Sequence, residues 1–388
     1  MDPHSRLPLQ GGLPPFESAG GPALPVVEIA CDESGFSGTN LLDAATPVFT
    51  HASVDLGREE AAGLVEDLKS GSSWPPGEFK SGQLLRGPRA RESLEPLLAA
   101  LADRAHVQVV DKELFLVTRV LDLLLAEPSY AAGTSLSGEL RPAALALYRE
   151  GRSRESDWHT FLSCFVELVR TKKRHVTDRH LLGAFFSARD ALVDGLDAHG
   201  EAGRVLAGLT RTRTRAVLAR LAHDDPAVPP PLEPMLPALA ETVLFWSAGR
   251  RQVLVVHDEQ SALTATRLRR LQRALALAPD WVGSSGRSRS ASPDDGDDGS
   301  EPGRVSPLAG LVTVDSRDDP RVQVADILAG VARRSPDIDG DPLLRPFLSP
   351  TSLRDPGRGE TLDPAAPRAR ARPPARACRR AAPRPSAG

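Results

Sequence analysis

Short runs of apolar residues, separated by polar turns, predict the strands of a buried sheet. The runs lie at residues 26–31, 46–54, 107–110, 253–257 and 311–314. Continuous runs of this kind are typical of strands that are buried on both faces. Apolar residues that recur every three or four positions predict helices at residues 58–69, 91–104 and 264–277. The chain therefore reads as an α/β protein.

From about Leu114 to Trp246 the pattern is helical almost throughout. We interpret residues 114–250 as a large insert of several antiparallel helices packed on the sheet, between a first core part (24–113) and a second (251–334). Three apolar stripes carry this interpretation: Leu121, Leu124 and Leu125; Phe161, Phe165 and Leu168; and Leu206, Leu209, Val217 and Leu221.

Three segments have the composition of disordered chain, namely residues 1–23, the linker 283–307 and the tail 335–388. The linker contains clustered aspartates but lacks the spacing of an EF-hand loop, which favours a solvated surface excursion. The tail is rich in arginine and could dock on nucleic acid by charge, but disorder alone is the better interpretation.

Composition limits the classes of protein that this chain can represent. Its 388 residues, 40% hydrophobic, suffice for a sizeable core, and its net charge of −3 argues against a protein that coats nucleic acid through bulk charge. A local basic groove stays open. The three cysteines have no metal-ligand spacing. No apolar run reaches the length of a membrane span, and no signal peptide is visible, so we expect a cytoplasmic protein without a membrane partner.

Carboxylates follow two of the predicted strands. Asp32 directly follows the apolar run at residues 26–31. Asp258 directly follows the run at residues 253–257. A carboxylate at a strand end lies at the rim of the sheet, where α/β proteins build their sites. Such an acid can also simply cap a turn, so neither residue alone identifies a site.

A third acid is predicted on the last helix. Asp319 is a suitable N-cap and Pro320 suits the first helical turn. The core-facing stripe of this helix then consists of Val324, Ile327, Leu328 and Val331. Asp326 lies beside that stripe, at the border of core and solvent, where either a metal ligand or an ordinary surface aspartate is found.

Together, Asp32, Asp258 and Asp326 predict a site for Mg²⁺ or Mn²⁺, because these ions prefer carboxylate oxygens. Two such ions, about 4 Å apart, can activate water and stabilise the leaving oxygen in phosphodiester cleavage. Glu78 would be a fourth carboxylate and Lys80 would face phosphate, although a solvated pair in a Pro/Gly loop is an equal alternative. Asp111 and Lys112 end a strand in the same manner but rank lower.

Other chemical motifs are absent from the sequence. The histidines lack HExxH spacing, and His257 should point away from Asp258 because neighbours on a strand alternate. No P-loop, GxGxxG motif or nucleophile elbow is present. The helix that contains Arg211, Arg213, Arg215 and Arg220 is basic, and a solvated face is slightly favoured over a nucleic-acid contact.

The acidic motifs resemble those of the domain of unknown function 3800 family, bacterial proteins thought to have a ribonuclease H-like fold. The resemblance rests on Asp32-Glu33-Ser34-Gly35, Glu78-Phe79-Lys80-Ser81, Asp258-Glu259, and Asp315-Ser316 with Gln323-Val324-Ala325-Asp326. It implies a mixed sheet with one acid on the first strand, one after the fourth strand and one on the closing helix, which are Asp32, Asp258 and Asp326. The helical insert and the Asp-rich linker depart from a compact core of this kind.

The leading hypothesis is a metal-dependent nuclease in which Asp32, Asp258 and Asp326 bind the ions, Glu78 completes the shell and Lys80 faces phosphate. A non-catalytic binding module of a defence or mobile-element system is the alternative, with no protein partner identified. A haloacid-dehalogenase-type phosphatase ranks last, because it requires an aspartate where Ser34 stands.

Overall fold

The computed structural model describes residues 24–36, 38–70, 90–170, 179–279, 281, 305–335 and 337–355. The expected disordered segment 1–23 and nearly all of the linker lie outside these ranges. So do Glu78 and Lys80. What the sequence predicts for those two residues stays a prediction.

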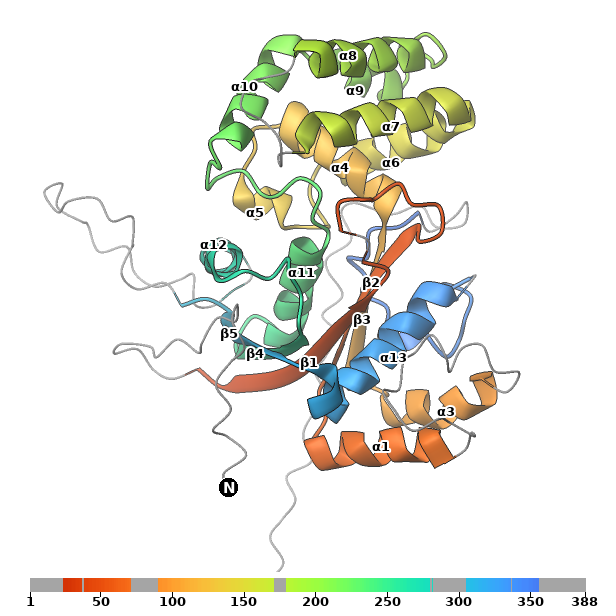
Figure 1. Cartoon of the computed structure of the whole chain (residues 1–388), viewed down its shortest axis with the longest axis vertical. Helices are drawn as coiled ribbons and strands as arrows, with labels where there is room; N and C mark the ends of the chain where they lie inside the picture. Colours follow the sequence, from red (N-terminus) through yellow and green to blue (C-terminus); the bar gives the residue numbers. More distant parts are fainter. Residues whose placement is uncertain are drawn as a thin grey trace, which may run out of the picture.

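A five-stranded mixed sheet lies at the centre of the fold, in the order β3-β2-β1-β4-β5 (Figure 1). β1 pairs antiparallel with β2, which pairs antiparallel with β3, whereas β1, β4 and β5 are parallel. The α/β prediction is confirmed. The strands are β1 (Val26–Ser34), β2 (Val48–Val54), β3 (Ala105–Asp111), β4 (Gln252–Asp258) and β5 (Leu308–Val314).

One face of the sheet packs on a small layer that includes α1 (Arg58–Ser70), α3 (Ala90–Ala100) and α13 (Pro320–Arg334). We call this the α13 face. Its apolar contacts include Ala30, Ala52 and Val256 from the strands and Ile327 and Leu328 from α13. Asp319 caps α13 by accepting a hydrogen bond from the backbone N–H of Arg321, as the sequence predicts.

The opposite face, which we call the α11 face, supports the helical layer. Its core joins strand residues such as Ile29, Phe49 and Val255 to the buried side chains of the helices. Most of the described residues between β3 and β4 lie in helices, as predicted, and α12 (Ala265–Leu275) covers the same face after β4. The helices between the two strands are α4 (Lys112–Leu124), α5 (Tyr130–Gly133), α6 (Arg141–Gly151), α7 (Glu155–Val169), α8 (Arg179–Val193), α9 (Glu201–Gly208), α10 (Arg211–Ala222) and α11 (Met235–Ser247), with a 3₁₀ turn at Arg152–Arg154.

Part of the segment 335–388, which the sequence predicts to be disordered, has a defined structure. Residues 337–355 form a segment with a 3₁₀ turn, η4 (Arg345–Phe347), and its side chains Leu344, Phe347 and Leu353 are buried. Leu348 and Leu353 make bridges to β3. The sequence after residue 335 is dominated by Pro, Ala and Arg, so its few apolar residues did not predict a structured segment. Several of these residues are buried by contact with the edge of the sheet. Residues 356–388 lie outside the described ranges.

Candidate functional site

Asp32 lies near the carboxyl end of β1 and faces α13. β1 continues to Ser34, so Asp32 lies within the strand and not just past its end. It pairs across the sheet with Ala52, whose side chain packs on the α13 face. Asp32 is only 6% exposed. The N–H of Glu33 donates a 2.7 Å hydrogen bond to its Oδ1 atom and so fixes one carboxylate oxygen.

Asp258 is the last residue of β4, the parallel neighbour of β1. The register pairs Cys31 with His257, so the next residue along each strand brings Asp32 beside Asp258. Asp258 is half-buried, and the backbone N–H of Ser316 donates a 3.0 Å hydrogen bond to its Oδ1 atom. The turn after β5 thus orients the second acid.

Asp326 lies in the middle of α13 and is half-buried. Two contacts fix this helix along β1. Near the helix start, Arg321 Nη1 donates to Glu28 Oε1 at 2.6 Å, and near its end, Arg333 Nε donates to Ser34 Oγ at 2.9 Å. Because the helix follows β1 from Glu28 to Ser34, Asp326 is held over the part of the strand that contains Asp32.

The three aspartates are close enough to influence one another electrostatically. Burial, followed by repulsion from Glu33, Asp326 and Asp258, raises the pKa of Asp32 well above its usual value. Burial also raises the pKa of Asp258, and Asp315 and Asp326 add to the effect. The structure therefore brings Asp32 close to two acids that lie more than 200 positions later in the sequence, as the rim prediction requires.

Glu33 joins this cluster, although the sequence interpretation assigned it no role. Burial is the main cause that raises its pKa to about 7, and the hydrogen bond from Gln260 opposes the shift. Gln260 Nε2 donates to Glu33 Oε1 at 2.5 Å. The Oε2 atom of Glu33 is buried without a hydrogen-bond partner and lies 3.9 Å from His257 Nε2. The adjacent acids of the Asp32-Glu33 pair were the available signal for this residue.

The carboxylates interact without forming an assembled metal shell. Over the described ranges, no group of three or more His, Cys, Asp or Glu side chains is arranged to hold a metal ion. The donor set is nevertheless of the right chemical kind for a hard cation, since it consists of carboxylate oxygens.

His257 points away from Asp258, as predicted, to the face of the sheet where its Nε2 atom lies near Glu33. Its ring stacks on His51 with centroids 5.4 Å apart, on the α11 face of the sheet. His257 Nδ1 is 2.9 Å from the carbonyl oxygen of Asp258, and burial lowers the pKa of His257 to about 4. His51 Nδ1 lies 3.0 Å from Thr242 Oγ1 of α11. These imidazoles are neutral core groups at pH 7.

Asp111 and Lys112 have a structural role. Asp111 caps α4 by accepting from the N–H of Leu114 at 3.0 Å and also accepts from the Tyr148 hydroxyl at 2.6 Å. Lys112 is buried, its Nζ atom donates to Thr46 Oγ1 at 3.1 Å, and burial lowers its pKa to about 8. Their lower rank in the sequence interpretation agrees with these contacts.

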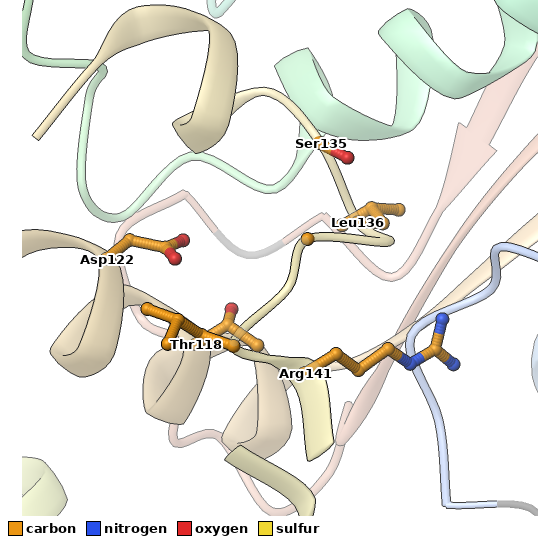
Figure 2. Close-up of a pocket in the computed structure, with 7 residues that line it drawn as sticks. Thr118, Asp122, Ser135, Leu136 and Arg141 are labelled. Atoms are coloured by element: carbon orange, nitrogen blue, oxygen red, sulfur yellow. The ribbon is translucent and has the colours of Figure 1, made fainter. Parts of the chain in front are cut away.

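A small pocket in the helical layer lies apart from the acids. Figure 2 shows Thr118 and Asp122 of α4 facing the segment that contains Ser135 and Leu136. The guanidinium of Arg141 is turned away from Asp122 and donates to the carbonyl oxygen of Ser352 at 2.5 Å. The pocket contains none of the predicted site residues.

No family model, no curated protein and no solved structure matches this chain. The resemblance to the domain of unknown function 3800 family therefore stays a prediction from the sequence motifs. Every helix in the described part of the chain is too short or too polar to cross a membrane.

Proposed function

We propose that the protein is a divalent-metal-dependent phosphodiesterase of the nuclease type, built on a ribonuclease H-like core. The observation that carries the proposal is the convergence of Asp32, Asp258 and Asp326 from two parallel strands and the closing helix. These are the three positions that the family resemblance implies for the acids. The central position of β1 in a mixed sheet supports the same fold.

The donor chemistry of the site fits Mg²⁺ or Mn²⁺. Asp32, Asp258 and Asp326 would hold the ion through carboxylate oxygens, and burial of Asp32 beside other acids creates a concentration of negative charge that a cation relieves. A bound ion of this type lowers the pKa of a water molecule and neutralises charge on a phosphoryl oxygen.

The chain itself orients the carboxylates before any ligand arrives. The N–H of Glu33 fixes Asp32, and the N–H of Ser316 fixes Asp258, so two of the proposed ligands have defined rotamers. Arg321 and Arg333 anchor the helix that carries Asp326. Such prior orientation limits the entropy that is lost when substrate and ion bind. The roles that the sequence predicts for Glu78 and Lys80 stay predictions, because both residues lie outside the described ranges.

The test is a cleavage assay with labelled single-stranded and double-stranded DNA and RNA, in Mn²⁺, in Mg²⁺ and in EDTA. Asp326→Asn should reduce Mn²⁺-dependent cleavage by about a thousandfold or more, equivalent to about 4 kcal/mol in the activation free energy. Asp190→Asn is the matched control, because Asp190 is an exposed aspartate of α8 in the helical layer and its carboxylate is paired with Arg189. Its cleavage rate should stay within about twofold of wild type.

The proposal fails if the wild-type protein cleaves none of these substrates in either metal. It also fails if Asp326→Asn cleaves at the wild-type rate. Nucleic-acid binding without any cleavage would favour the non-catalytic binding module.

A further inference from the structure

Two helices of the helical layer contain arginine as their sole charged residue type. α10 and α12 each carry four arginines and no aspartate or glutamate, in a chain whose net charge is −3. α12 is strongly amphipathic, with Leu268, Leu271 and Leu275 buried. We call the two sets together the arginine surface: Arg211, Arg213, Arg215 and Arg220 of α10, and Arg267, Arg269, Arg270 and Arg273 of α12.

Both helices form ion pairs with the turn that contains Asp224 and Asp225. Arg220 Nε lies 2.7 Å from Asp225 Oδ2, and Arg270 Nη2 lies 3.4 Å from Asp224 Oδ2. Both arginines lower the pKa of Asp225, although its hydrogen bond from the backbone of Ala227 contributes most. In Figure 1 both helices lie at the left of the view, with α10 above α12. Asp224 and Asp225 therefore join the basic groups of the two helices at one turn.

The neighbouring carboxylates neutralise only part of this charge. Arg213 and Arg220 share Glu127, and Arg267 lies 3.8 Å from Glu233. With Asp224 and Asp225, that makes four carboxylates for eight arginines. Arg215, Arg269 and Arg273 are exposed and have no acidic partner within the described residues. The excess is positive and faces solvent.

The surface begins at the end of the sheet that carries the acids. α12 follows β4 directly, and its N-cap Thr264 lies six positions after Asp258. An eleven-residue helix is about 16 Å long, a length that matches several nucleotide spacings of about 3.4 Å each. α12 packs on the α11 face, whereas Asp258 lies at the rim of the sheet, where β4 ends. A nucleic acid that contacts both would therefore pass around the end of β4.

We propose that the arginine surface binds the phosphate backbone of a nucleic acid strand whose scissile bond lies at the acids. This inference rests on the proposed function and names its substrate class as a polynucleotide longer than a few nucleotides. Guanidinium groups suit this role because they remain charged and bind phosphate oxygens in a bidentate manner. The contacts are to phosphates, so binding does not depend on base sequence.

The experiment measures binding without catalysis, by fluorescence anisotropy of a labelled single-stranded DNA of about 20 nucleotides in EDTA. The test variant is Arg215→Gln/Arg269→Gln/Arg273→Gln. The control variant removes the same charge from exposed arginines outside the two helices, as Arg204→Gln/Arg250→Gln/Arg345→Gln. Double-stranded DNA, RNA and polyglutamate serve as competitors.

The test variant should bind at least about tenfold more weakly than wild type, and the slope of log K against log salt should become shallower by about 2, because three phosphate contacts are lost. The control variant should lie near wild type. Equal affinity of the test and control variants overturns the inference, as does competition by polyglutamate equal to that by nucleic acid.

A small substrate separates this inference from the proposed function. Bis(p-nitrophenyl) phosphate is too short to reach the arginine surface from the acids. The test variant should hydrolyse it at the wild-type rate in Mn²⁺, and Asp326→Asn should not. Loss of small-substrate hydrolysis in the test variant would contradict a role limited to backbone binding. DNA binding by a wild-type protein that hydrolyses neither substrate would instead contradict the nuclease proposal.

Discussion

The two faces of the sheet bury different titratable groups. The α13 face contains Asp32 and Asp258 beneath Asp326, whereas the α11 face contains His51, His106 and His257. Burial raises the pKa of the carboxylic acids and lowers the pKa of the imidazoles, since it disfavours the charged form of each.

The outcome at neutral pH is nevertheless unequal. An imidazole with a lowered pKa is neutral at pH 7 and packs as a ring, as the 3.9 Å stacking of His106 on Phe245 illustrates. Clustered carboxylates retain negative charge that repels itself. We therefore expect a cation to stabilise the α13 face and not the α11 face. This contrast is why we assign chemistry to one face and structure to the other.

The largest expected effect is metal stabilisation confined to the α13 face. Free Mn²⁺ at about one hundred times its Kd should raise the free energy of unfolding by about 3 kcal/mol. Asp32→Asn should abolish this increase, because it removes a buried ligand. His51→Gln, on the other face, should retain it. Urea unfolding with and without Mn²⁺ measures all three proteins. An increase that survives in Asp32→Asn would place the ion elsewhere.

A smaller effect is expected from acidification on the α11 face. Burial lowers the pKa of His106 to about 3, from an ordinary value of 6.5. Between these two pH values, the imidazole of His106 is protonated in the unfolded state but not in the folded state. Its contribution to stability is complete above pH 6.5 and is lost as pH falls. Between pH 6.5 and 5, wild type should lose about 2 kcal/mol more than His106→Phe.

Urea unfolding in EDTA at several pH values measures this difference. His51 and His257 are present in both proteins, so the difference isolates His106. Parallel pH profiles would show that the imidazole of His106 is protonated in the folded state. Buried carboxylic acids with raised pKa values act in the opposite sense, since their contribution is present at low pH and is lost as pH rises.

The smallest effect concerns the polar link between α11 and the sheet. Trp246 Nε1 donates to Ser53 Oγ at 2.8 Å, and both side chains are buried. Trp246→Phe removes the donor but keeps an aromatic ring, so the free energy of unfolding should fall by about 1 kcal/mol. Nucleic-acid cleavage should be unchanged. If cleavage falls in parallel with Asp326→Asn, the division of roles between the two faces is wrong.

The elements of this fold could be predicted from local patterns. Continuous apolar runs gave the strands, and the helical stretch between β3 and β4 followed from its three apolar stripes. The boundaries differ by a few residues, for example at α3, which ends at Ala100 and not at Arg104. The α13 cap was also predictable, because Asp319 and Pro320 act on adjacent backbone groups. The segment 337–355 was misjudged because its few apolar residues are buried only by contact with β3.

Some features of the candidate site also follow from local sequence, whereas others depend on contacts between distant segments. The residue types at the strand ends can be read directly from the sequence, and strand alternation alone predicts that His257 turns away from Asp258. The contact between Glu33 and Gln260, and the approach of α10 and α12 through Asp224 and Asp225, are visible only in the folded chain. Local patterns follow from interactions within a few residues. Contacts between distant segments depend on strand order and helix packing, which no short stretch of sequence specifies.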